Sequence, residues 1–410
     1  MRMQLQISSG RTGCPSLDRW RVRGLRSLLF QVAFCLLLSS SVGRSSPPTD
    51  EDLSHLKRSV VTNYAAVVFA TYQECWAAVE KMKTSVDDFI AKPSEQSLSA
   101  ARQTWLAART PYSQTEAFRF YDGPIDQVEP MINAWPIDEN YIDQVTGEPD
   151  AGVINAVAKF PEVSTELILA LNEKEGKKNI SAGFHAIEFL LWGQDTDVAG
   201  PGNRSWRDYT DEAKNGKRRC DYLRIVAALL RDTLQTVAAD WSPTISTNYR
   251  AKFLAMNPDE ALANILKGIG ALSGPELAGE RLTSPYETKE QEEEQDCFSD
   301  NTRNDLIDDA IGIQNVYLGR HPGSNGPKVS GPGVHDLLAR VNPEFAAKLA
   351  AQIEASIICA RKIPQPFDQA ILGADTSPGR IAVKNAATTF QAESDMIAKA
   401  AKLLAIKLNL

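Results

Sequence analysis

The sequence predicts an all-α protein built from two tandem four-helix-type bundles, with a long proline-rich crossover in the first. Apolar residues recur at three- and four-residue steps through most of the chain, and no segment shows a convincing alternating strand pattern. The composition, 43% hydrophobic and 23% charged, is that of a globular protein with an ample core. We expect residues 44–215 to form the first bundle and residues 216–410 the second.

The first 43 residues differ from the rest of the chain. Six arginines and a single acid, Asp18, precede an apolar run at 28–38 and small residues at 39–43. A basic start, an apolar run too short to span a bilayer comfortably and a small-residue cleavage position are typical of a signal peptide. We therefore expect residues 1–43 to be removed and the mature protein to be periplasmic. An uncleaved anchor or association with the outer membrane is the alternative.

The expected helices follow one another along the mature chain. Periodic apolar residues and breaking prolines predict helices over 53–89, 97–120 with a bend at Pro111, 164–171, 181–193, 218–241, 248–256, 259–272, 300–317, 342–362 and 377–410. Five prolines make residues 121–163 an irregular crossover, and loops of this length inside a domain are usually functional. The Gly- and Pro-rich stretch 194–216 is the expected domain boundary, and the acidic run 287–296 is read as a solvated loop.

The segment 181–195, SAGFHAIEFLLWGQD, is the centre of the functional prediction. Two polar side chains, His185 and Glu188, interrupt its apolar run and share one face of the helix at a three-residue spacing. Gly183, one turn earlier, lets a partner approach closely. A buried His and Glu are costly unless each has a partner, and a shared metal ion would satisfy both. A buried His–Glu hydrogen bond that only stabilises the core is the alternative.

Several standard catalytic patterns are missing from the sequence. Neither HExxH nor HxxEH occurs, and the other three histidines (His55, His321 and His335) lie far from the motif in sequence. The paired Glu-x-x-His pattern of di-iron bundles is also missing. The net charge of −8 becomes more negative once the basic N-terminal segment is removed, which argues against nucleic acid or an anionic membrane surface as a partner.

The motif Gly183-x-His185-x-x-Glu188 with its continuation FLLWGQD resembles the signature of the imelysin family. Further segments match that family in order: YSQTEAFRF at 112–120, CFSDNT at 297–302, GIQNVYLG at 312–319 and IPQPFD at 363–368. The resemblance covers nearly everything after about residue 55. It implies an exported, all-helical bacterial protein with its site between two similar bundles. Family members were first described as metallopeptidases and are often tied to iron uptake.

The resemblance also supplies candidates for the rest of the site. Glu116, in YSQTEAFRF, is the first candidate for a further metal ligand, with a salt bridge to Arg119 as its alternative role. Arg119 itself, Asp126, Ser299, Asp300, Asn315 and Tyr317 are candidates for lining the site, and helix capping is the alternative role of Asp300. One histidine with several carboxylates suits iron in either oxidation state, manganese or calcium, and zinc remains an alternative to iron.

Two of the six cysteines leave with the signal peptide, and an even number remains in an oxidising compartment. None forms a CxxC zinc pattern. We expect Cys220 to pair with Cys297, because both flank the start of a helix in the second half. Buried free thiols are the alternative.

Three functions remain open at this point. The first is an exported iron-binding protein that works with a component of an iron-transport system and contacts membranes only peripherally or through an anchor. The second is a metallopeptidase of the imelysin type. The third is a non-catalytic helical scaffold.

Overall fold

The computed structural model describes residues 50–196, 200–324 and 326–408, so the predicted signal peptide lies outside the described residues. The described chain is predominantly α-helical, as the fold-class prediction expects, and adds one short antiparallel hairpin in the loop before α12 (Val334–Val341). In this part of the chain, no helix combines the length and the apolar character needed to cross a membrane.

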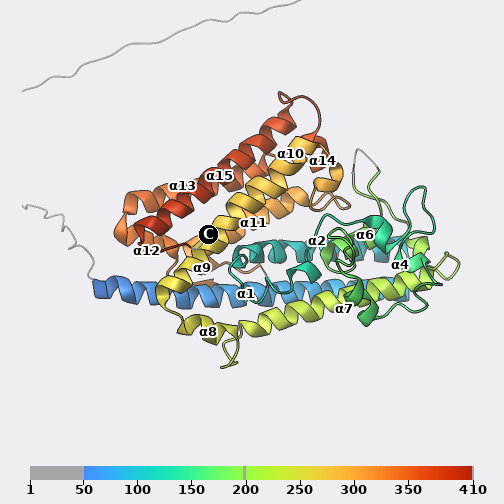
Figure 1. The fold of residues 1–410 in the computed structure, drawn as a ribbon, viewed down its shortest axis with the longest axis horizontal. Coiled ribbons are helices and arrows are strands. Elements are labelled where there is room, and N and C mark those ends of the chain that lie inside the picture. The colour runs from blue at the N-terminus through green and yellow to red at the C-terminus, as the bar shows by residue number, and fades with distance from the viewer. Residues whose placement is uncertain (1–49, 197–199, 325, 409–410) are drawn as a thin grey trace, which may run out of the picture. The chain divides into compact units, whose positions relative to one another are not determined.

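Three long helices lie lengthwise in the lower half of the molecule in Figure 1: α1 (Asp50–Ala91), α2 (Glu95–Thr115) and α7 (Gly216–Asp240). α1 packs against both α2 and α7. Of the side chains that mark its apolar face in the sequence, Leu53 and Leu56 are partly buried. The others are buried: Val60, Tyr64, Val67, Thr71, Cys75, Val79, Met82, Val86 and Phe89. α2 starts at a capping box between Ser94 and Ser97 and keeps Pro111 inside it. α7 follows the predicted domain boundary, yet it packs along α1; the boundary itself stays a prediction.

The crossover after α2 contains only short helical pieces, as its prolines predict. The 3₁₀ turn η1 (Glu116–Phe118) ends α2, and the crossover then holds η2 (Glu129–Met131), α3 (Glu139–Ile142) and α4 (Gly152–Asn155). A short helix, α5 (Thr165–Leu171), leads to the motif helix α6 (Phe184–Trp192). α6 packs between α2 and α7. After it come the 3₁₀ turn η3 (Trp206–Tyr209) and then α7.

The upper half of the molecule in Figure 1 is formed by the C-terminal helices. Beyond α8 (Tyr249–Ala255), one continuous helical run comprises α9 (Pro258–Ala271), the π-helical segment η4 (Leu272–Thr283) and α10 (Ser284–Thr288). The remaining elements are η5 (Gln291–Glu293), α11 (Thr302–Leu318), β1 (Arg320–His321), β2 (Val329–Ser330), α12 (Val334–Val341), α13 (Pro343–Arg361), α14 (Phe367–Ile371) and α15 (Pro378–Leu403). α15 packs on η4, α9 and α13, and α13 packs on α11.

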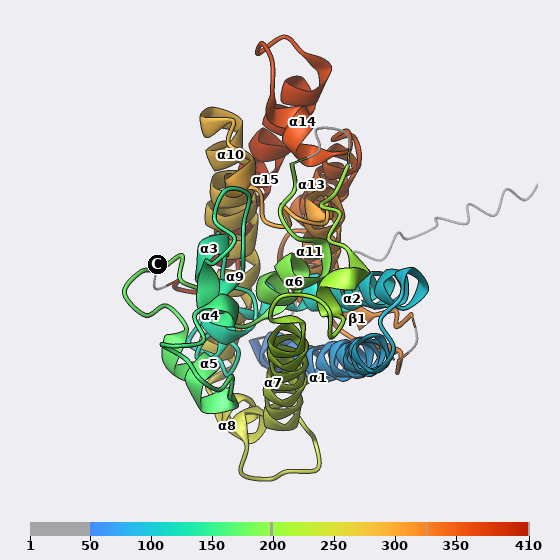
Figure 2. The same ribbon diagram turned by 90° about the vertical axis from the view of Figure 1, so that its right-hand side faces the viewer.

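The two halves meet where α2 lies against α11, which Figure 2 shows from the end. Gly312 on α11 makes this close contact possible, because a Cβ there would lie 2.6 Å from the carbonyl oxygen of Gln114. The loop that enters α11 therefore reaches the motif helix α6, which packs on α2 from the first half.

Three details of the sequence interpretation are wrong. α11 begins after the N-cap Asn301 rather than Asp300. The final helix ends at Leu403, short of the expected residue 410. The acidic run 287–296 is not solvated throughout, since Glu294, Gln295 and Asp296 are at most 3% exposed.

The predicted disulfide is also absent, because all four cysteines of the described chain are free. Cys220 lies in the first turns of α7, where its Sγ is 3.4 Å from the carbonyl oxygen of Tyr209. Cys297 lies in the loop before α11, next to Phe298, whose backbone contacts the motif helix. Both cysteines flank a helix start in sequence, but these are two different helices in different surroundings.

Candidate metal centre

The motif helix α6 is buried along its whole length. All residues of Phe184–Trp192 are at most 4% exposed. Gly183, just before the helix, has a φ of 91°, and a Cβ there would lie 2.5 Å from the carbonyl oxygen of Ile132. This close approach lets the N–H of Phe184 donate to that carbonyl at 2.7 Å. Only glycine tolerates both the positive φ and the contact, so Gly183 fixes the start of the helix against the crossover.

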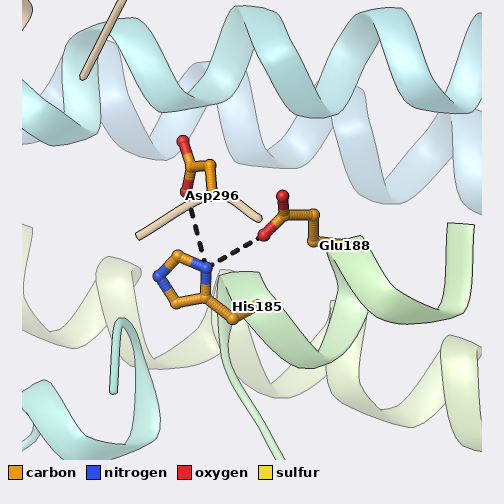
Figure 3. A group of neighbouring side chains, drawn as sticks. All are labelled: His185, Glu188 and Asp296. Atoms are coloured by element: carbon orange, nitrogen blue, oxygen red, sulfur yellow. Dashed lines mark hydrogen bonds and ion pairs between the residues drawn. The ribbon is translucent and has the colours of Figure 1, made fainter. Parts of the chain in front are cut away.

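Three side chains able to bind a metal ion meet beside this helix: His185, Glu188 and Asp296 (Figure 3). Nδ1 of His185 lies 3.0 Å from Oε2 of Glu188 and 3.5 Å from Oδ1 of Asp296. Their candidate ligand atoms all lie within 4.8 Å of one another. None of the three residues is more than 2% exposed. The predicted pair on α6 is thus completed by a carboxylate from the loop that precedes α11.

A chain of hydrogen bonds fixes the tautomer of His185. Its Nε2 lies 3.1 Å from Oδ1 of Asn133, and the same oxygen accepts from Nη1 of Arg109 at 2.5 Å. Because an arginine can only donate, the Asn133 atom that faces it must be the oxygen, and Nε2 of His185 must carry the proton. The unprotonated Nδ1 then directs its lone pair at the two carboxylates, as in a metal-binding histidine whose other nitrogen is held by a partner.

The lone pair of Nδ1 and the two carboxylate oxygens that it faces repel one another unless a proton or a cation lies between them. Burial raises the pKa of Glu188 to about 8 and raises the pKa of Asp296 well above its usual value. Burial also lowers the pKa of His185 well below 6.5, so this imidazole is neutral. Without a metal ion, protons on the carboxyl groups relieve the repulsion, and a metal ion would take their place.

The second carboxylate oxygen of Glu188 is held by the loop before α11. Oε1 accepts from the N–H of Ser299 at 2.9 Å, from its hydroxyl at 2.7 Å and from the N–H of Phe298 at 3.3 Å. These donors orient the carboxylate so that Oε2 faces His185. Ser299, predicted to line the site, therefore positions a candidate ligand.

A buried guanidinium completes the surroundings of Asp296. Nε of Arg109 donates to Oδ2 of Asp305 at 2.8 Å, and its Nη2 lies 3.6 Å from Oδ1 of Asp296. Nδ2 of Asn301 donates to Oδ2 of Asp296 at 3.1 Å and to Oδ1 of Asp305 at 2.9 Å. The positive charge of Arg109 balances the negative charge of Asp305. The two candidate carboxylate ligands, Glu188 and Asp296, are then left without a positive charge of their own. One divalent cation would neutralise these two carboxylates, and buried charges require such compensation.

Glu116 and Arg119, also predicted for the site, lie in a separate ionic cluster. Oε2 of Glu116 accepts from Arg119 at 2.6 Å and from Arg281 at 2.5 Å. Arg281 in turn donates to Asp309 at 2.7 Å. Burial opposes ionisation of Glu116, but the two arginines more than offset it and bring its pKa down to about 2. The alternative role of Glu116, a salt bridge to Arg119, is the one observed, and Glu116 is not among the three converging side chains.

The remaining predicted residues have structural contacts elsewhere. The carboxylate of Asp126 accepts from the N–H groups of Phe120, Tyr121 and Gly123 and closes a turn. The hydroxyl of Tyr317 donates to the carbonyl of Ala346 at 2.8 Å, and Asn315 donates to Gln114 at 3.3 Å. Asp300 has a φ of 58° and directly follows Ser299. The structure thus brings Ser299 to the candidate ligands and gives Asp126, Asn315 and Tyr317 other partners.

Sequence analysis missed Asp296, Asn133 and Arg109. Asp296 stands directly before the segment CFSDNT, but its acidic neighbours made it look like part of a solvated loop. Arg109 lies one turn after the buried Trp105 on α2, and a charge on that buried face was the available signal. Asn133 lies in an irregular crossover, where no periodicity indicates which side chains point inward.

Comparison with known proteins relates the chain to a family and to one iron-regulated protein. A family model described as Imelysin matches residues 68–396. Iron-regulated protein A of Synechococcus elongatus is 24% identical in an alignment of 340 residues that covers 81% of this chain and 82% of the relative.

Two solved structures share the fold. One is described as a putative iron-regulated protein A precursor from Parabacteroides distasonis, with a TM-score of 0.66, 20% identity, and coverage of 87% of this chain and 97% of that one. The other is an imelysin-like protein from Psychrobacter arcticum, with a TM-score of 0.58, 12% identity, and coverage of 87% and 98%. With the family model matching most of the sequence, the chain belongs to the imelysin family.

Proposed function

We propose that this protein is an exported metal-binding protein of a bacterial iron-uptake system. It binds one divalent metal ion, with iron as the expected cargo, through Nδ1 of His185, Oε2 of Glu188 and Oδ1 of Asp296. The observation that carries the proposal is the unprotonated Nδ1, which faces two carboxylate oxygens at 3.0 and 3.5 Å inside a buried cluster.

A purely structural role does not explain this arrangement. A scaffold needs each buried polar group to be satisfied, and an amide would satisfy Nδ1 of His185 at lower cost than a carboxylic acid. Instead, two acids approach the same nitrogen, and burial raises the pKa of both. Groups with shifted pKa values that converge on one point are typical of functional sites.

The donor set and the charge balance suggest the class of metal. One imidazole nitrogen and two carboxylate oxygens suit iron, manganese and zinc, whereas calcium prefers a shell of oxygens alone. A divalent ion matches the combined charge of Glu188 and Asp296. The names of two relatives, both called iron-regulated protein A, support iron among the divalent candidates.

Burial of the three candidate ligands argues for binding rather than peptide hydrolysis. A peptidase must let the scissile carbonyl of its substrate reach the metal and a water molecule. His185, Glu188 and Asp296 are at most 2% exposed, so none of the three candidate ligands faces solvent. A small ion can enter such a site through side-chain motion, but a polypeptide cannot.

Calorimetric titration of the chelator-treated protein with ferrous, manganous and zinc ions, under anaerobic conditions for iron, tests the proposal. We expect one equivalent of metal to bind more tightly than about 0.1 mM, or about −5.5 kcal/mol. His185→Ala and Asp296→Asn should lose this binding, and Glu344→Gln, an exposed carboxylate on α13, should retain it.

Absence of binding to the wild type, or equal binding by the ligand variants, would refute the proposal. A parallel assay with an unfolded protein substrate addresses the peptidase alternative. Cleavage that a chelator abolishes, and that both ligand variants lack, would show that the metal serves hydrolysis instead.

A further inference from the structure

A groove separate from the metal centre lies along the N-terminal half of α1. It has a volume of about 760 Å³, within the usual range of small-molecule sites. α1 supplies one wall, α8 supplies Arg250, and the segment that follows β2 supplies the opposite wall. The lining residues are Glu51, Ser54, His55, Arg58, Ser59, Thr62, Asn63, Ala66, Arg250, Ser330, Gly331 and Pro332.

The hairpin wall of this groove is fixed in place by α1. Nδ2 of Asn63 donates to the carbonyl oxygens of Gly319 at 2.7 Å and Pro332 at 3.1 Å. Gly331 lies so close that a Cβ there would meet the Asn63 side chain at 2.4 Å. The groove is therefore formed by anchored backbone on one side and a helix on the other.

Basic side chains from two helices line this groove, and neither forms a salt bridge with another described residue. Among the described residues, Arg58 and Arg250 form no salt bridge, whereas the neighbouring Lys57 pairs with Asp259 at 2.6 Å. Arg250 is half-buried, and within the described part of the chain its guanidinium donates only to the backbone carbonyl of Ala65. Burial lowers its pKa, as expected for a guanidinium that lacks a counter-ion.

This distribution of charge is unusual for an acidic chain with a net charge of −8. Glu51 is the single acid in the lining, and His55 lies one turn from Arg58 on the same face of α1. The hydroxyl groups of Ser54 and Ser330 form no hydrogen bond to other described residues and are available as donors. Two guanidinium groups with nearby hydroxyl donors are the chemistry that recognises carboxylate and phosphate oxygens.

We propose that this groove binds a small organic anion that carries carboxylate or phosphate groups. Arg58 and Arg250 contact its anionic oxygens from two helices, and the serine hydroxyls complete the contacts. Two guanidinium groups from different helices favour a ligand with more than one anionic group over a single small ion. The groove shares no lining residue with the metal centre, so this site does not depend on metal binding.

Calorimetric titration of the chelator-treated protein tests the proposal, with citrate and inorganic phosphate as anionic probes and sucrose as a neutral probe. We expect citrate to bind more tightly than phosphate, sucrose not to bind, and affinity to fall as salt is added. Arg58→Gln and Arg250→Gln should each weaken citrate binding at least about tenfold, the effect of losing one charge-assisted contact.

Arg58→Gln is the cleaner variant, because the guanidinium of Arg58 forms no hydrogen bond to other described residues and its loss should leave the fold intact. Arg224→Gln is the matched control: it removes the same group from an exposed arginine of α7 that pairs with Asp221. It should change citrate affinity less than about twofold. Metal titration of Arg58→Gln should match the wild type, which separates this proposal from the metal-binding one.

Lack of citrate binding at about 1 mM, or equal binding by Arg58→Gln and the wild type, would overturn the proposal. A second arm uses vesicles of phosphatidylglycerol and of phosphatidylcholine. Binding to the anionic vesicles without binding to free citrate or phosphate would also overturn it, because the anionic group would then belong to a lipid headgroup.

Discussion

Replacing Glu188 by glutamine should make the metal-free protein more stable while it abolishes metal binding. Glutamine keeps the shape of the side chain. Its carbonyl oxygen can accept from Ser299 and Phe298 as Oε1 does now. Its amide can donate to Nδ1 of His185, which lies 3.0 Å from Oε2 in the wild type. The variant therefore satisfies every neighbour without a group that can ionise.

The size of this effect follows from the pKa of Glu188, which burial raises from 4.5 to about 8. Below pH 4.5 the carboxyl is protonated in both the folded and the unfolded state, and the shift has no effect on stability. As the pH rises from 4.5 towards 8, the unfolded state ionises first, and the wild type loses about 1.36 kcal/mol per pH unit. At pH 7 the loss is about 3 kcal/mol, and Glu188→Gln should recover it.

Urea unfolding in the presence of a chelator, at about pH 4.5 and pH 7, measures this difference directly. We expect similar stability of wild type and variant at the lower pH and a variant more stable by about 3 kcal/mol at the higher pH. Adding metal at about 100 times its dissociation constant should stabilise the wild type by about 2.7 kcal/mol and the variant far less. The exposed control Glu344→Gln should stay within about 0.5 kcal/mol of the wild type throughout.

Two outcomes would refute this reasoning. A variant less stable than the wild type at pH 7 would mean that the contact between His185 and Glu188 stabilises the fold, as a scaffold role requires. Equal stabilisation of both proteins by metal would mean that Glu188 is not a ligand.

The remaining predictions concern pH, a second buried acid, the thiols and export. Metal affinity should rise with pH up to about 8, because protons on Glu188 compete with the metal while His185 is already neutral. Calorimetry in several buffers should show proton release on binding, and an affinity that does not change with pH in this range would contradict the prediction. Glu393→Gln should stabilise the protein increasingly above pH 4.5, because burial raises the pKa of Glu393 to about 8. Melting temperatures of wild type and variant at about pH 5 and 8 measure this gain, and a variant less stable than the wild type at pH 8 would contradict the prediction. Thiol titration of the denatured, unreduced mature protein should find Cys75, Cys220, Cys297 and Cys359 free, and a linked peptide pair in a non-reducing map would show otherwise. N-terminal sequencing of the exported protein should begin close to residue 44, and a start at residue 1 or 3 would contradict the signal-peptide prediction.

The sequence by itself determined most of the long helices and the central pair of the candidate site. Periodic apolar side chains predict α1 and α7 to within a few residues, because the burial of a helix face repeats every three to four residues. Asn342 followed by Pro343 predicts the start of α13, and the Asn342 side chain does accept from the N–H of Phe345 at 3.0 Å. The pair His185 and Glu188 is also a local feature, since two positions three apart on a helix are neighbours in any fold.

Tertiary structure decided everything that depends on segments far apart in the chain. In the folded chain, Asp296 lies next to Nδ1 of His185. Asn133 lies next to Nε2 on the other side of the same imidazole ring, and Arg109 donates to Asn133. Tertiary packing also pairs Glu116 with Arg281 in a salt bridge and leaves Cys220 and Cys297 as free thiols. An acidic loop residue looks the same in sequence whether solvent or a histidine surrounds it. The local sequence pattern indicates which face of a helix is apolar, but only tertiary packing decides which loop covers that face. Here the loop that covers α6 supplies the third candidate ligand.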